Sequence, residues 1–135
     1  MADRNFPSVR IMNFQRDGVL ICGHFSVDPV GLGIQAFSRF GNGWTVAYTA
    51  LGRFTVTTDE TFRHIIAYGS QFCAATPTDQ FTTADLSTGG TGAQVGIEIN
   101  LWDAGAAALA NPAAATDEFH FWMFLSTSIS DRAAW

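Results

Sequence analysis

Residues 44–58 read WTVAYTALGRFTVTT. Apolar side chains alternate with Thr and Ala in each half, a pattern typical of β-strands with one buried face. Residues 50–52 (ALG) interrupt the alternation, and Gly accepts the positive φ that a three-residue hairpin loop commonly needs at its end. A hairpin on this loop has one apolar face with two opposite pairs: Tyr48 with Phe54 and Val46 with Val56. A one-residue shift would oppose apolar and polar side chains, so the sequence predicts a hairpin in this register.

Strand patterns recur along the rest of the chain, at 18–25, 33–40, 62–74, 93–102 and 118–128. The last two alternate cleanly and predict two core rows: Val95, Ile97, Ile99 and Leu101, and Phe119, Phe121, Met123 and Leu125. Segments 76–92 and 103–117 consist of turn-forming or small residues, so we expect connections there. Residues 106–110 could form a helical turn, whereas Pro112 disfavours a long helix. These patterns predict an all-β fold, an antiparallel β-sandwich or jelly-roll-like barrel. We expect an extended N-terminal arm over residues 1–16 and one domain over 17–135.

Composition limits the classes of partner. Only 14% of the 135 residues are charged, against about a quarter in typical domains, so we expect other protein to cover part of the surface. The net charge is −5 and the basic residues are scattered Arg, which disfavours nucleic acid as a partner. No signal-peptide pattern and no run near the roughly 18 apolar residues of a membrane span occur. We therefore expect synthesis in the cytoplasm, no membrane partner, and buried, reduced thiols at Cys22 and Cys73.

Candidate catalytic groups lack the spacing of a known site. Gly41-Asn42-Gly43 precedes a strand rather than a helix, which favours a tight turn over a phosphate-binding loop. Asp59-Glu60 and Asp117-Glu118 flank strands. Adjacent strand residues point to opposite faces, so neither pair forms an acid–base couple and we expect both pairs in solvated turns.

Three histidines, His24, His64 and His120, each fall within a strand pattern. Three strands could bring them together as zinc ligands. Isolated strand histidines are more often packed or exposed, so we predict no metal site.

The two cysteines are expected to be buried, and buried cysteine thiols are unreactive. The sequence thus predicts no catalytic residue and no cofactor, and we expect that the protein is not an enzyme.

Three segments in order resemble small structural proteins of tailed bacteriophages. They are DGVLICGHFSVDPVG (17–31), GNGWTVAYTALGRFTVTTDETFRHIIAYGSQF (41–72) and GAQVGIEINLWDAGAAALANPAAATDEFHFWMFLS (92–126), with GRFTVT (52–57) and DEFHF (117–121) as the most similar parts. The resemblance is to head decoration (cement) proteins and related head-fibre or tail-fibre modules. It implies a virion protein without catalytic residues, a β-sandwich that binds the major capsid protein lattice from outside and clamps adjacent capsomers.

The N-terminal arm and the last residue are candidate partner-binding elements. Arginines alternate with apolar side chains in the arm, and such a segment has anchors to bury and charges to pair. The candidate residues are Arg4, Phe6, Arg10, Ile11, Phe14, Arg16 and Trp135. Pro7 favours an extended path that could add a strand to a neighbour, although residues 11–14 could equally form a first strand of the same domain. We expect self-association as a homotrimer, with a dimer as the alternative.

Two other classes of function remain open. A carbohydrate- or receptor-binding sandwich would use exposed aromatic side chains, and Trp102 and Trp122 lie out of phase with the apolar rows of their strands. Trp44 falls on the inward face of the hairpin, so we expect it in the core. A small jelly-roll hydrolase would instead need a bound metal or a reactive cysteine.

Overall fold

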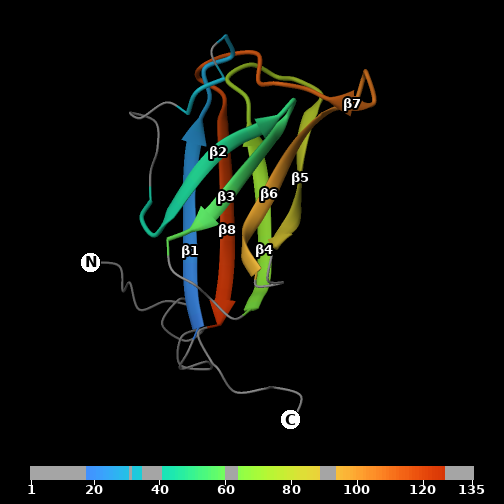
Figure 1. The fold of residues 1–135 in the computed structure, drawn as a ribbon. Coiled ribbons are helices and arrows are strands. Elements are labelled where there is room, and N and C mark those ends of the chain that lie inside the picture. Colours follow the sequence, from blue (N-terminus) through green and yellow to red (C-terminus); the bar gives the residue numbers. More distant parts are fainter. Residues whose placement is uncertain (1–17, 31, 35–40, 60–63, 89–93, 127–135) are drawn as a thin grey trace, which may run out of the picture.

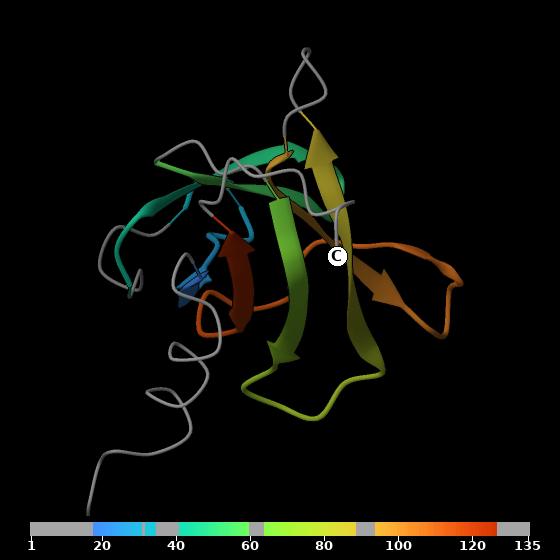
Figure 2. The same cartoon turned by 90° about the horizontal axis from the view of Figure 1, so that it is seen from below.

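The computed structural model describes residues 18–30, 32–34, 41–59, 64–88 and 94–126. The strands are β1 (Gly18–Ser26), β2 (Trp44–Ala50), β3 (Arg53–Thr58), β4 (His64–Cys73), β5 (Gln80–Thr88), β6 (Gln94–Asp103), β7 (Ala108–Leu109) and β8 (Glu118–Ser126). They form two antiparallel sheets, a three-stranded sheet in the order β1-β8-β4 and a second sheet in the order β2-β3-β6-β5, with β7 beside β6. The sheets stack face to face (Figure 1; Figure 2). The predicted all-β antiparallel sandwich is confirmed, while the jelly-roll-like alternative stays a prediction.

The β2–β3 hairpin has the register that the sequence predicts. Tyr48 pairs with Phe54, and Val46 pairs with Val56. The turn is one residue tighter than expected, because Ala50 pairs with Arg53 and an irregularity after Tyr48 absorbs the extra residue. Gly52 has a φ of 63°, the left-handed conformation that motivated the prediction.

The core lies between the sheets and is rich in aromatic rings. Both predicted rows are buried where the structure describes their side chains: Ile97, Ile99, Leu101, Phe119, Phe121, Met123 and Leu125. Trp44 is fully buried and meets Phe121 edge-on, with the ring centroids 4.7 Å apart. This confirms that Trp44 is a core residue rather than a ligand platform.

Each of the two predicted connections contains a strand. Residues 80–88 form β5, which pairs with β6 along its whole length. β5 lies at the edge of its sheet and its sequence is mostly polar. Apolar and polar residues therefore show little of the alternation that predicts a strand. Residues 106–110 form a turn followed by the short β7 instead of a helical turn. Pairing of Ala108 with Asp103 and of Leu109 with Trp102 outweighs the helix preference of alanine there.

Asp117 is buried, so the prediction of a solvated turn was wrong for this carboxylate. Its two oxygens accept hydrogen bonds from the backbone N–H groups of Ala75 and Ala114, at 2.9 and 3.0 Å. Asp117 therefore ties the β4–β5 connection to the segment before β8. Asp59 is exposed, as expected.

Several predictions fall outside the described residues. They concern the N-terminal arm, residues 35–40 of the strand predicted over 33–40, and Glu60. In the described residues, no helix is long and apolar enough to cross a membrane.

Candidate functional site

The outer face of the three-stranded sheet holds the candidate site. Phe119, Phe121 and the other odd-numbered residues of β8 turn into the core, so the even-numbered residues from Glu118 to Phe124 turn outward. The register then places outward residues of β1, β8 and β4 in rows across the sheet. In that strand order the rows are Leu20–Phe124–Ala67, Cys22–Trp122–Gly69, His24–His120–Gln71 and Ser26–Glu118–Cys73.

One part of this face is polar and contains a cluster of three possible metal ligands. His120 Nε2 lies 2.9 Å from Glu118 Oε2, and the two side chains are 42% and 41% exposed. The rings of His24 and His120 are stacked, with centroids 5.0 Å apart and planes inclined by 24°. One donor atom from each of these three residues lies within 4.8 Å of the other two. We call His24, Glu118 and His120 the His-Glu cluster.

A shallow hollow of about 390 Å³ opens beside the cluster. The side chains around it include Cys22, Gln71 and Trp122 together with both histidines of the cluster. The indole of Trp122 lies against the backbone of β4 at Gly69, where a Cβ atom would come within 2.8 Å of the ring. Gly69 thus makes room for the indole, which stays 45% exposed.

The adjoining part of the face is apolar. Leu20 is 50% exposed, and it pairs across the strands with Phe124. Ile66, at the irregularity in β4, is 46% exposed. We call Leu20, Ile66, Trp122 and Phe124 the apolar patch. The patch and the His-Glu cluster meet at Trp122.

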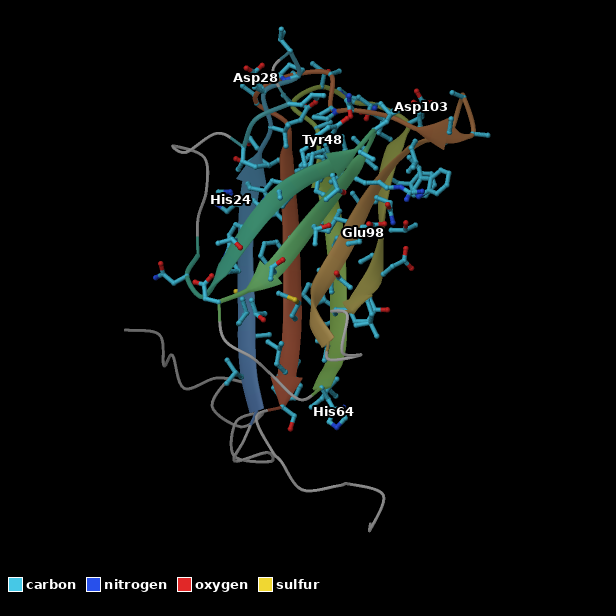
Figure 3. All side chains as sticks on the ribbon, in the orientation of Figure 1. His24, Asp28, Tyr48, His64, Glu98 and Asp103 are labelled. Atoms are coloured by element: carbon cyan, nitrogen blue, oxygen red, sulfur yellow. The ribbon has the colours of Figure 1, made fainter. Side chains whose placement is uncertain are left out.

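The histidines do not gather as one set of three. Direct pairing of β1 with β8 brings His24 and His120 together. His64 pairs with Ser126, seven residues before Gln71 on β4, which puts it about 20 Å along the sheet from the other two. Figure 3 shows His24 and His64 well apart along the sheet.

The buried environment predicted for the cysteines was wrong. Cys22 is exposed and Cys73 is half-buried, and both are free thiols. The apolar run in β1 suggested two buried faces, but the three-stranded sheet is covered by the second sheet on one face only. Trp102 and Trp122 both face outward, on different sheets, as their phase suggested.

Sequence reasoning missed Glu118 as a partner of His120. Glu118 was considered with Asp117, its neighbour in sequence, and not with the residue two positions on. Residues i and i+2 of a strand share a face, so the spacing of Glu118 and His120 in the sequence already indicated that their side chains are neighbours.

The candidate partner-binding residues all lie outside the described residues: Arg4, Phe6, Arg10, Ile11, Phe14, Arg16 and Trp135.

In comparisons with known proteins, no family model, no curated protein and no solved structure matches the chain.

Proposed function

We propose that this chain is a non-enzymatic structural protein of a tailed bacteriophage. In this proposal it binds the outer surface of the capsid lattice and stabilises adjacent capsomers, through the outer face of the β1-β8-β4 sheet. The resemblance of residues 17–31, 41–72 and 92–126 to head decoration proteins supplies the class of partner. The observation that carries the binding surface is the apolar patch.

The apolar patch has the make-up of an interface centre. Leu20, Ile66 and Trp122 are each about half exposed, at 50%, 46% and 45%. Interfaces place aromatic and aliphatic anchors in the middle and polar groups around them, and Trp is a frequent hot spot. The His-Glu cluster and Gln71 supply polar groups on one side of this patch. Burying the patch against a partner stabilises the complex by roughly 25 cal/mol for each Å² of apolar surface removed from water.

We also propose that the chain self-associates when it binds the capsid. A homotrimer fits the three-fold points of a capsid lattice, and a dimer fits the two-fold points. The N-terminal arm and Trp135 would then add contacts to the capsid or to a neighbouring copy. Deleting residues 2–16 and measuring the oligomer mass and the capsid affinity tests that part.

The test of the binding surface uses empty capsids of the phage that encodes the chain. Wild-type protein, Trp122→Ala and Trp102→Ala are sedimented with capsids, and thermal melts check that each variant folds. Trp102 is the matched control because it faces outward from the other sheet. We expect Trp122→Ala to weaken binding at least tenfold, in line with a loss of about 2 kcal/mol at a hot spot. Wild-type affinity in Trp122→Ala, or an equal loss in Trp102→Ala, would contradict this surface.

A carbohydrate-binding module is the second candidate, favoured by the hollow beside Trp122. An exposed indole beside amide and imidazole groups offers a sugar both a stacking surface and hydrogen bonds. Gln71→Ala distinguishes the two, because Gln71 lines the hollow and lies outside the apolar patch. Saturable retention on a glycan array that Gln71→Ala abolishes, with no capsid binding by the wild type, would replace the capsid proposal.

A further inference from the structure

We propose that the His-Glu cluster is a binding site for a divalent transition-metal ion, with zinc as the best match. The proposal does not depend on capsid binding. Among the described residues, His24, Glu118 and His120 form the one group of three or more possible ligands whose donor atoms all lie within 4.8 Å of one another. Two imidazoles and one carboxylate are among the known ligand sets of zinc, and imidazole also suits copper, iron and nickel.

The sheet fixes the positions from which the three side chains project. His24 and His120 are direct cross-strand partners, and Glu118 precedes His120 by two residues on the same face. β8 is the middle strand and is paired on both sides, with β1 and with β4. Ligands on a paired central strand are held more firmly than ligands on loops, so the backbone beneath the cluster is already ordered for binding.

The distances are close to those of a tetrahedral site. Zinc bonds of 2.0–2.2 Å in tetrahedral geometry place donor atoms about 3.3–3.6 Å apart. His120 Nε2 and Glu118 Oε2 are 2.9 Å apart, and no pair in the cluster exceeds 4.8 Å. Adjustments of about 1 Å, by rotation of half-exposed side chains, therefore bring all three donors into range. The stacked histidine rings would tilt so that their ring nitrogens converge on the ion.

Three protein ligands leave a fourth position open. In zinc sites of this kind that position takes water or an outside donor. The neighbouring hollow, with Gln71 and Cys22 at its edge, gives such a donor access to the ion. The site thus has the chemistry to hold a metal ion and to expose one coordination position to a small molecule or to a group on a partner.

Isothermal titration of the full chain with zinc chloride, and absorption spectroscopy with cobalt(II), test the proposal. We expect one tight site per chain and cobalt bands of a tetrahedral site. His24→Ala, Glu118→Gln and His120→Ala should each weaken binding at least tenfold, because mutating even the outer-shell partners of metal ligands typically costs about 10–100-fold. Because Glu118 and His120 are half-exposed and His24 is partly exposed, these variants should fold, and circular dichroism verifies it.

Matched controls separate this site from adventitious binding. His64→Ala removes an exposed strand histidine at the far end of the same sheet, and it should leave the affinity unchanged within twofold. The variant with Cys22→Ser and Cys73→Ser should also bind as the wild type does. No binding at millimolar zinc would overturn the proposal. Zinc affinity that stays at the wild-type level in all three cluster variants would also overturn it. Loss of zinc affinity in the cysteine variant or in His64→Ala would do the same.

Discussion

Phe54→Ala removes one of the aromatic rings with which the β2–β3 hairpin packs against the opposite sheet. Phe54 is fully buried, and its ring lies 4.7 Å from that of Phe119 and 5.9 Å from that of Phe25, centroid to centroid. Burial of about 200 Å² at about 25 cal/mol per Å² gives about 5 kcal/mol, of which the alanine retains a part. Measured Phe→Ala substitutions in cores cost about 3–5 kcal/mol, so we expect a loss of about 4 kcal/mol in the free energy of unfolding.

The assay is equilibrium unfolding in urea, with a thermal melt alongside. An unfolding entropy of about 2.1 cal/mol/K per residue over 135 residues converts 4 kcal/mol into a fall in Tm of about 14 °C. Leu51→Ala is the matched control, because Leu51 lies in the turn of the same hairpin and is 54% exposed. The control should stay within about 0.5 kcal/mol of the wild type. A loss below about 1 kcal/mol for Phe54→Ala, or an equal loss for Leu51→Ala, would refute this placement of Phe54.

Three further predictions concern the turn, the buried carboxylate and the thiols. Gly52→Ala should destabilise the protein by more than about 1 kcal/mol, because the residue has a φ of 63° and a Cβ atom would lie 2.6 Å from the Ala110 carbonyl oxygen; an unchanged Tm would show that the turn is misplaced. Asp117→Asn should lower the free energy of unfolding by about 2–3 kcal/mol, because the NH2 group of the asparagine replaces one of the two oxygens that accept backbone hydrogen bonds. Wild-type stability of this variant in urea would mean that the two bonds do not form. Iodoacetamide should label Cys22 before Cys73, since Cys22 is exposed and Cys73 half-buried; peptide mass spectrometry showing the reverse order would contradict the outer face described for β1.

The hairpin could be predicted because its signals are local. The loop at residues 50–52 and the alternation on both sides of it favour one register. The same alternation identified the inward rows of β6 and β8. β5 could not be found in this way, because it is stabilised by pairing with β6 and shows little alternation of its own.

The candidate site depends on a contact between distant parts of the chain. His24 and His120 meet only because β1 pairs with β8 in one register, and no local signal in either strand specifies that pairing. The outward position of Cys22 also depends on which face of the sheet is covered. The proximity of Glu118 to His120 could be predicted from the sequence, because the two residues lie two positions apart on the same strand.

We propose that the outer face of the β1-β8-β4 sheet is the surface that binds the capsid. The direct measurement of this surface is cryo-electron microscopy of virions of the phage proposed to encode the chain. We expect sandwich-shaped density on the outside of the capsid, with β1, β8 and β4 against the capsid protein and Trp122 at the contact. Virions without such density, or density in which the β2-β3-β6-β5 sheet faces the capsid, would contradict it.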